Sequence, residues 1–287
     1  MSKPKILLQL DPDTQASVFD AVVAVDSGVD HLLQYRGVTP GQVRDLVHGC
    51  IFTRGGADLA ATAIFVGGSQ IAAGEALLGE VLASFFGPMR VSVMLDASGA
   101  NTTAAAAVLA ASKHLDLSQI SATVLGGTGP VGQRVARLLV GSGASVKLAS
   151  RAIERAEIAC SEIRQRNPGG SITAVKTSND DETLAAIAGS QLVVAAGAAG
   201  IVLLKKSQIE AATDLKVVVD LNAVPPLGIE GVKSSDKAAQ LGHVLAYGAL
   251  GVGGTKMKIH RACVASLFES NSQVLDAEAI FEVGKKL

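Results

Sequence analysis

A glycine-rich turn at residues 126–132 carries the clearest chemical signal in the chain. Gly127, Gly129 and Gly132 have the G-x-G-x-x-G spacing, between an apolar run and a helical pattern. In that context the first glycine permits a sharp turn, the second admits a pyrophosphate to the backbone, and the third lets helix and strand pack closely. The helix N-terminus adds N–H donors and a favourable dipole. The spacing predicts a dinucleotide-binding turn made of Gly127, Thr128, Gly129, Pro130, Val131 and Gly132.

The residues after the next strand indicate which dinucleotide to expect. A strand predicted at 145–149 ends at Ser150 and Arg151, where a dinucleotide-binding fold usually places an acidic ribose ligand. Serine and arginine supply donors and positive charge instead, which suits a 2′-phosphate. Arg155, one helical turn further on, is a second candidate partner for that phosphate. We therefore predict NADP rather than NAD; the alternative is a plain βαβ unit with surface arginines.

Three more segments of small residues follow predicted strands and can bring a nicotinamide ring close to the backbone. They are 197–200, 222–226 and 248–254. The alternative for each is close packing at the top of a sheet. At these strand ends we expect cofactor contacts from Ala196, Gly197, Asn222 and Gly253.

The composition is that of a globular chain with sizeable cores. The 287 residues are 48% hydrophobic and 18% charged, with a net charge of −1. This balance gives no reason to expect nucleic acid or an anionic membrane as a partner.

No apolar run reaches the roughly 18 residues of a membrane span, and residues 1–4 lack the apolar core of a signal peptide, so we expect a cytoplasmic protein. Three scattered cysteines without C-x-x-C spacing indicate neither disulfides nor a metal site, and we expect small core residues there.

Alternating strands and helices must position these residues, which predicts an α/β fold of two domains. A polar stretch at 96–103, before an alanine-rich helix, is the expected crossing point between them. The first domain is a substrate-side α/β unit of residues 1–103, completed by residues 270–287 with a C-terminal helix at 276–286. The second is a Rossmann-type NADP-binding domain of residues 104–269. Strands are expected at 5–10, 31–35, 62–66, 91–95, 120–125, 145–149, 172–175, 192–196, 215–220 and 244–247.

Motifs along essentially the whole chain resemble the NADP-dependent methylene-tetrahydromethanopterin dehydrogenases of methylotrophic bacteria, which are relatives of the methylene-tetrahydrofolate dehydrogenases. The sequence departs from the family pattern at Leu221, at Val224 and across 57–61. The matching segments are SVFDAVVAVDSG from Ser17, VTP from Val38, IFVGG from Ile64, NTTAAA from Asn101, GGTGPVG from Gly126, VDLNAVPPLGI from Val219, GALGVGGTKMKIHRAC from Gly248 and LFES from Leu267.

The resemblance implies oxidation of an N5,N10-methylene-tetrahydropterin to its methenyl form, with hydride passing to C4 of the nicotinamide. The methylene carbon lies between two nitrogens whose lone pairs stabilise the developing cation, so no substrate proton is removed and no general base is required. The protein must hold two rings in hydride-transfer geometry and exclude water.

The resemblance also implies Lys256 as the catalytic residue, beside the nicotinamide and bound to a polar edge of the pterin. The alternative is a solvated lysine in the first turn of its helix, like Lys258. Asp20 lies three residues after Ser17, which by itself favours a capping role; the resemblance adds pterin binding. The implied substrate-binding residues are Asp20, Gly68, Ser98, Asn101, Thr102 and Lys256.

The expected partner is a one-carbon carrier of the tetrahydromethanopterin type. Two alternatives stay open: a methylene-tetrahydrofolate dehydrogenase, and a non-catalytic NADP-binding sensor. The resemblance further implies a homo-oligomer, with a trimer favoured.

Overall fold

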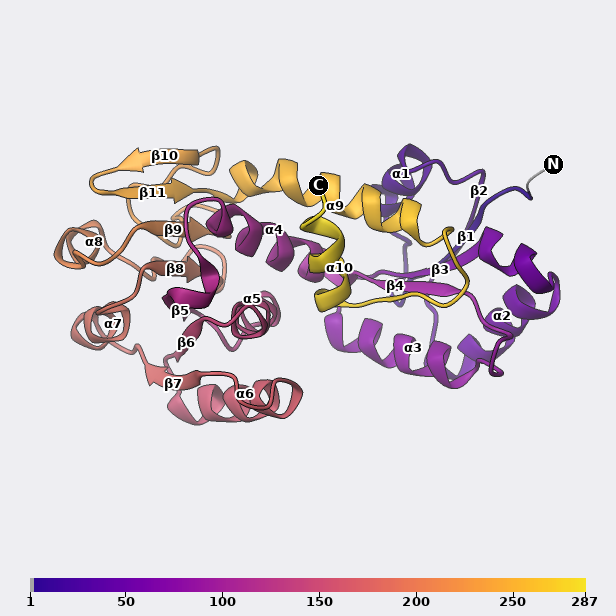
Figure 1. Cartoon of the computed structure of the whole chain (residues 1–287), viewed down its shortest axis with the longest axis horizontal. Coiled ribbons are helices and arrows are strands. Elements are labelled where there is room, and N and C mark those ends of the chain that lie inside the picture. Colours follow the sequence, from indigo (N-terminus) through magenta and orange to yellow (C-terminus); the bar gives the residue numbers. More distant parts are fainter. Residues whose placement is uncertain (1–2) are drawn as a thin grey trace. The chain divides into compact units, whose positions relative to one another are not determined.

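A computed structural model describes residues 3–287 and divides the chain into two compact units (Figure 1). Unit 1 comprises Met1–Thr102 and Met257–Leu287, and unit 2 comprises Thr103–Lys256. The sequence predicts the second crossing between residues 269 and 270, whereas the contacts divide the chain between Lys256 and Met257. Both crossings run inside helices, α4 (Ala100–Ser112) and α9 (Ala249–Ser266), so no loop composition marks either one.

Unit 1 is built on a parallel sheet of five strands in the order β12-β4-β3-β1-β2. The short edge strand β12 (Val274–Leu275) pairs with β4, so the C-terminal segment adds a strand as well as the expected helix, α10 (Ala277–Gly284). A strand of two residues is too short to leave a pattern in the sequence. The remaining strands are β1 (Ile6–Leu10), β2 (His31–Tyr35), β3 (Thr62–Val66) and β4 (Ser92–Leu95).

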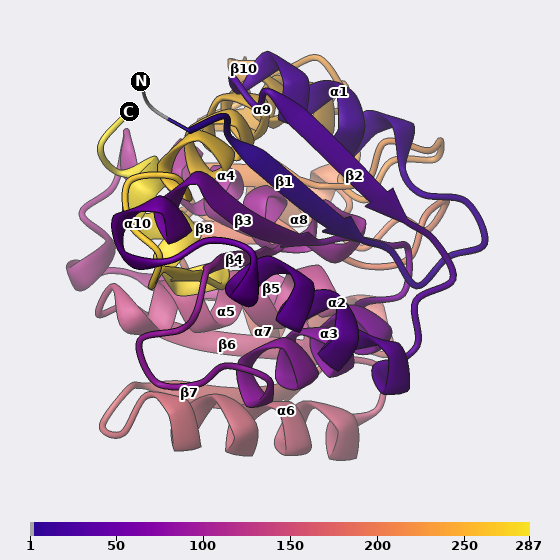
Figure 2. The same cartoon turned by 90° about the vertical axis from the view of Figure 1, so that its right-hand side faces the viewer.

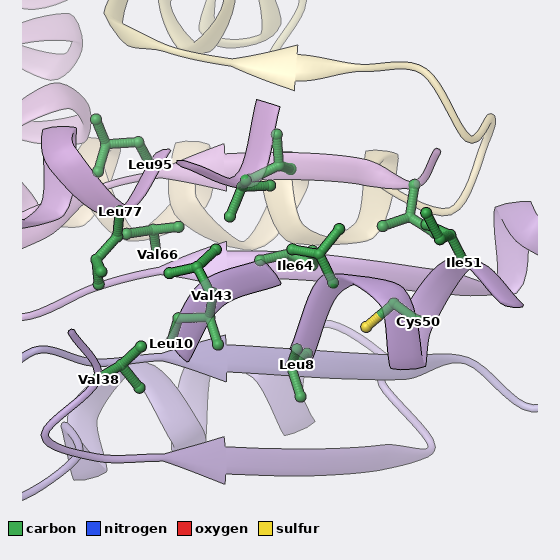
Figure 3. Packing of buried hydrophobic residues seen from close by; sticks show 14 of the residues in the cluster. Leu8, Leu10, Val38, Val43, Cys50, Ile51, Ile64, Val66, Leu77 and Leu95 are labelled. Carbon is green, nitrogen blue, oxygen red and sulfur yellow. The ribbon is translucent and has the colours of Figure 1, made fainter. Parts of the chain in front are cut away.

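One apolar core lies between this sheet and two helices, α2 (Pro40–Phe52) and α3 (Ile71–Ala83). Both helices lie on the same side of the strands (Figure 2). Leu8, Ile64 and Val66 of the strands belong to one cluster with Val43 and Leu77 of the helices (Figure 3). Burial of these side chains stabilises the packing of the two helices on the sheet. Candidate substrate residues follow the carboxyl ends of β1, β3 and β4.

Unit 2 contains a sheet of seven strands in the order β10-β11-β9-β8-β5-β6-β7. From β7 to β11 this is the 3-2-1-4-5-6 strand order of the Rossmann fold, which confirms the predicted fold class. The chain order switches between β5 and β8, where ligands bind in such sheets. The strands are β5 (Ser121–Leu125), β6 (Ser145–Ser150), β7 (Ile172–Lys176), β8 (Leu192–Ala195), β9 (Val217–Asp220), β10 (Lys237–Leu241) and β11 (Val244–Tyr247).

The helices of unit 2 connect these parallel strands (Figure 1). The antiparallel strand β10 is absent from the sequence prediction because its residues, KAAQL, lack β-branched side chains and clean alternation. Besides α4 and the first part of α9, these helices are α5 (Pro130–Gly141), α6 (Ile153–Arg166), α7 (Asp180–Ile187) and α8 (Lys206–Ala211).

Two predictions about individual segments have clear outcomes. The polar stretch 96–103, expected to precede the alanine-rich helix, contains the first residues of that helix, because α4 begins at Ala100. The three cysteines are free and buried, as expected, and burial raises the pKa of the Cys50 and Cys263 thiols to about 12. Within residues 3–287, the helices all fall short of the length and apolarity that crossing a membrane requires.

Candidate dinucleotide and substrate sites

The glycine-rich turn connects β5 to α5, but the individual glycines have different structural roles from those predicted. Gly126 takes the left-handed conformation, with φ of 66°. Gly127 instead donates its N–H to the Ala149 carbonyl at 2.9 Å and packs on Leu148, where an added Cβ would come within 2.7 Å of Cγ. Gly132 packs on Gly127, with 2.8 Å between an added Cβ and the Gly127 Cα. The turn thus depends on Gly126 for its conformation and on Gly127 and Gly132 for strand–helix contact.

Gly129 is the N-cap of α5 and Pro130 occupies its first turn. Proline suits that position because its missing N–H would have no partner within the helix. The first amides of α5 therefore face the end of β5 without a side-chain cap from Gly129. Such a helix N-terminus favours a phosphate, because its N–H groups and its dipole both attract an anion.

A cavity of about 870 Å³ opens at this end of the sheet, between the turns that follow β5, β6, β7 and β8. Its volume suits a large ligand that lies mostly within the protein. The predicted cofactor residues that line it are Thr128, Gly129, Pro130, Ser150, Arg151, Arg155, Ala196 and Gly197. Thus much of the predicted cofactor set meets around one cavity.

The β6 end of the cavity carries positive charge. Ser150 closes β6 with its side chain largely buried, and its Oγ accepts the Ala152 N–H at 3.3 Å. The exposed Arg151 and Arg155 line the same cavity. Of the acidic residues Asp180 and Glu230 in the lining, Asp180 is paired with Lys205 at 2.5 Å, which offsets its charge. A glycine cradle with two arginines at the ribose position fits a dinucleotide that carries a 2′-phosphate.

The other predicted cofactor residues, Gly127, Val131, Gly132, Asn222 and Gly253, are absent from the described lining of this cavity. Gly127 and Gly132 are used in packing. Asn222 stabilises its own turn: its side-chain N–H donates to the Pro226 carbonyl at 3.3 Å, and its Oδ1 accepts the Val224 N–H at 3.0 Å.

Asp220, the last residue of β9, is fully buried just before this turn. Burial raises the pKa of its carboxyl above the ordinary value of 3.8, and hydrogen bonds from the backbone of Asn222, Ile229 and Gly228 oppose that rise.

The glycines at 248–254 are also not a simple turn, because α9 already starts at Ala249. Gly248 and Gly251 allow this helix to pack against the backbone around Ser234 and Asp236, where an added Cβ would clash. An added Cβ at Gly253, in contrast, would meet no described atom within 4 Å. Lys256 therefore lies in the helix interior rather than in its first turn, and it is half-buried whereas Lys258 is exposed.

In unit 1 the expected substrate residues gather at the carboxyl ends of β1, β3 and β4. Ser17 caps α1 (Val18–Asp26) and its Oγ accepts the Asp20 N–H at 3.2 Å. The Ser17 N–H, which a complete capping box would direct to Asp20, donates to Asp11 Oδ2 at 2.9 Å instead. The Asp20 carboxylate lies near Gly67, 3.2 Å from the position of an added Cβ.

Gly68 and Ser98 form a constrained contact beside this carboxylate. Gly68 has φ of 96°, and an added Cβ would lie 2.5 Å from Pro12 Cδ. Ser98 also has a positive φ, 55°, and donates its N–H to the Gly68 carbonyl at 2.6 Å. A non-glycine residue with a positive φ carries backbone strain, and such strain is typical of functional sites.

Asn101 and Thr102 lie in the first turn of α4, buried around Asp96. Both donate backbone N–H groups to Asp96 Oδ1, at 2.9 and 3.0 Å, and the Thr102 hydroxyl donates to Oδ2 at 2.6 Å. The Asn101 side-chain amide donates to the Leu95 carbonyl at 2.5 Å. These contacts give both residues a structural part in starting α4.

His260 is a buried residue of this region that the sequence prediction missed. Its ring stacks on Phe65 with centroids 5.5 Å apart, lies 6.3 Å from the Phe19 ring, and places Nδ1 3.9 Å from Asp96 Oδ2. The one available signal was its place in α9, one helical turn after Lys256. Within residues 3–287, no group of three or more histidine, cysteine or acidic residues could hold a metal ion.

Together the fold and the cavity define a two-unit protein with a Rossmann-type dinucleotide site, as in NAD(P)-dependent dehydrogenases. A solved structure with this fold is the 5-ketofructose reductase of Gluconobacter sp. strain CHM43, with a TM-score of 0.54, 13% identity and 99% of each chain covered.

Sequence comparisons identify the family. Residues 18–98 match the family model for the N-terminal part of methylene-tetrahydromethanopterin dehydrogenase. Over 289 aligned residues and the full length of both chains, the protein is 46% identical to the bifunctional protein MdtA of Methylorubrum extorquens. It is 31% identical, over 88% of its length and 87% of the relative's, to the NAD(P)-dependent methylenetetrahydromethanopterin dehydrogenase of the same organism. The chain belongs to the methylene-tetrahydromethanopterin dehydrogenase family, which confirms the resemblance seen in its motifs and makes it an oxidoreductase of one-carbon metabolism.

Proposed function

We propose that the protein oxidises N5,N10-methylene-tetrahydromethanopterin to its methenyl form, with NADP as the hydride acceptor, in the cytoplasm. The observation that carries this proposal is the cavity of unit 2, in which the phosphate-binding turn and the pair Ser150 and Arg151 meet, in a chain of this family. The relatives' names support the substrate, and the charge at the end of β6 supports the choice of NADP.

Each group in the cavity has a definite task. The first amides of α5 bind the diphosphate, because they are free of a side-chain cap. Arg151 and Arg155 bind the 2′-phosphate through charge-assisted hydrogen bonds. Ala196 and Gly197 line the adjoining wall, where their small size leaves space for the cofactor. When bound, NADP supplies the nicotinamide carbon that accepts the hydride.

The substrate residues follow from the family, and apart from Lys256 they belong to unit 1. The Asp20 carboxylate accepts hydrogen bonds from the adjacent donor groups of a pterin ring. Gly68 and Ser98 fix the backbone near it through their hydrogen bond, while Asn101 and Thr102 hold the start of α4. Lys256 orients the pterin by binding a polar edge of the pterin ring. Its ammonium must lie to one side of the reacting carbon, because a positive charge close to the forming cation would raise the barrier.

A second candidate is the corresponding oxidation of methylene-tetrahydrofolate, which presents the same reacting ring. A non-catalytic NADP sensor is the third possibility, and the substrate-side motifs outside the nucleotide cavity speak against it.

The protein is further proposed to form a homo-oligomer, with a trimer favoured. Support comes from an apolar stripe on α1, where Val18, Val22 and Val25 are exposed at helical spacing. The edge strand β2 adds the exposed Leu33 and Tyr35. Exposed apolar surface of this kind is typical of protein contacts. Sedimentation at micromolar concentration tests this: a trimer is expected, and a monomer alone would contradict it.

One assay separates the three candidate functions. Purified protein is mixed with NADP and with each methylene pterin in turn, and the absorbance of reduced nicotinamide is followed. Reduction with the tetrahydromethanopterin derivative supports the proposal, and reduction with the folate derivative alone supports the second candidate. Measurable NADP binding without reduction of NADP by either pterin would support the sensor function instead.

A further inference from the structure

The buried carboxylate of Asp220 holds the two ends of the loop that follows β9. Its Oδ1 accepts the Asn222 N–H at 3.0 Å, and its Oδ2 accepts the Ile229 N–H at 2.8 Å. Oδ1 also lies against Gly228, 2.8 Å from the position of an added Cβ. A carboxylate has two oxygens with a fixed separation, so it can bind amides from both ends of one loop at once.

The far end of this loop holds a second segment of the chain, 196–204. The Gly228 carbonyl accepts the N–H groups of Leu203 and Leu204, at 2.7 and 3.1 Å. Glu230 donates its N–H to the Leu204 carbonyl at 2.9 Å, in register with a parallel bridge between Leu204 and Ile229. The position of segment 196–204 therefore depends on the position of Gly228 and Ile229.

Segment 196–204 forms a wall of the dinucleotide cavity and reaches the phosphate-binding turn. Its members Ala196, Gly197, Ala198, Ile201, Val202 and Leu203 line the cavity. The Leu203 side chain packs on Gly197, with 2.7 Å between Cδ1 and an added Cβ. Gly197 in turn touches the backbone of Gly126. A continuous set of contacts thus runs from the Asp220 carboxylate to the cradle for the diphosphate.

We propose that Asp220 is a positioning residue for the cofactor: by binding Asn222 and Ile229 it sets the cavity wall formed by segment 196–204. This inference rests on the proposed dinucleotide function of the cavity. Asp220 is buried and its carboxylate is bonded to its own loop, so it acts through the wall rather than by contact with the cofactor. A shift of this wall changes the shape of the cavity and of the phosphate-binding turn together, and so weakens binding.

Asp220→Asn in the full chain tests the proposal. Asparagine keeps the shape but turns an N–H₂ group toward a backbone donor, so one of the two clamping bonds is lost. We expect the Kd for NADP, measured by titration well below the melting temperature, to rise at least about tenfold. Hydrogen exchange should also accelerate at the amides of Leu203 and Leu204, which bond the Gly228 carbonyl, whereas a defect confined to the Asn222 end of the loop would leave them unchanged.

Asp116→Asn is the control, because Asp116 also accepts a backbone N–H in unit 2, from Ser118 at 3.1 Å, but it belongs neither to loop 221–229 nor to segment 196–204. It should leave both readouts within twofold of wild type. An Asp220→Asn protein with wild-type Kd, or with wild-type exchange in 196–204, would overturn the inference. Should that variant not fold, Gly228→Ala displaces the same loop from the other side and must raise the Kd likewise. Failure of the proposed function looks different, because then the wild type itself binds no NADP or reduces none.

Discussion

Gly126 and Gly197 meet backbone to backbone: a Cβ added to Gly126 would lie 2.5 Å from the Gly197 Cα. Gly126 follows β5 and Gly197 lies just beyond β8, the two strands between which the chain order of the sheet switches. The contact leaves no space for side chains at the point where the phosphates are expected. Small residues here are thus a steric requirement of the cavity, in addition to the conformational requirement at Gly126.

Gly126→Ala should lower both stability and cofactor affinity. The left-handed backbone at Gly126 alone costs an L-residue about 1–2 kcal/mol, and the contact with Gly197 adds to that cost because backbone atoms cannot move aside cheaply. Gly189→Ala is the control, since Gly189 also has positive φ, 70°, but open space around it. In urea melts Gly189→Ala should lose about 1–2 kcal/mol and keep its Kd for NADP. Equal losses of stability in the two variants would refute the steric part of the argument.

Arg151→Asp should weaken NADP binding far more than NAD binding, because it replaces a partner of the 2′-phosphate with a repelling charge. A charge-assisted hydrogen bond contributes roughly 1.5–3 kcal/mol, which corresponds to at least about tenfold in affinity. Titration of both cofactors checks this. Arg166→Asp, on the same helix as Arg155 but outside the cavity lining, should leave the ratio of the two Kd values unchanged. Equal losses of affinity for NADP and NAD would contradict the assignment of Arg151 as a partner of the 2′-phosphate.

Lys256→Ala should sharply lower turnover with methylene-tetrahydromethanopterin while NADP affinity stays nearly constant. Displacing a reactant by about 1 Å can cost on the order of 100-fold in rate. Lys258→Ala is the control, because Lys258 lies on the same helix but is exposed. Steady-state kinetics should separate the two variants by at least about tenfold in kcat, or roughly 1.4 kcal/mol in barrier. Near-normal turnover in both variants would show that Lys256 does not position the pterin. Asp20 would then be the first other residue to test.

Gly253→Ala should raise stability yet reduce activity. A glycine inside a helix is less stable than alanine by about 0.5–1 kcal/mol, and no described atom near Gly253 stands in the way of a Cβ. If the cofactor approaches this backbone, as predicted from the sequence, the added methyl group obstructs it and KM for NADP rises. Gly79→Ala in α3, where an added Cβ likewise meets no described atom within 4 Å, should bring a similar gain in thermal stability with unchanged KM. An unchanged KM in Gly253→Ala would remove Gly253 from the cofactor site.

The strand–turn–helix unit around the cofactor turn could be predicted because its determinants are local. Apolar runs, the glycine spacing and the pair Ser150 and Arg151 all lie within one βαβ unit, and the cavity forms there. Which of two adjacent glycines takes the positive φ could not be predicted from spacing. That choice depends on the packing of Gly127 on Leu148, a side chain of the next strand.

The substrate side was harder to predict because its contacts are distant in sequence. His260 is buried by Phe65 of β3 and lies near Phe19 of α1, and no spacing connects these three residues. The polar segment that contains Asn101 and Thr102 looks like a loop until the buried Asp96 accepts their amides. Similarly, the domain crossings lie inside helices, where composition does not change. In each case tertiary contact overrides the local pattern.

Transfer of deuterium from the substrate tests the central claim most directly. Methylene-tetrahydromethanopterin that carries two deuterium atoms on its methylene carbon is incubated with the protein and NADP, and the reduced nicotinamide is analysed by mass spectrometry. Direct hydride transfer predicts one deuterium in each molecule of reduced cofactor, and none lost to water, because no substrate proton is removed. Formation of unlabelled reduced cofactor, or of none at all with an active pterin preparation, would contradict the account.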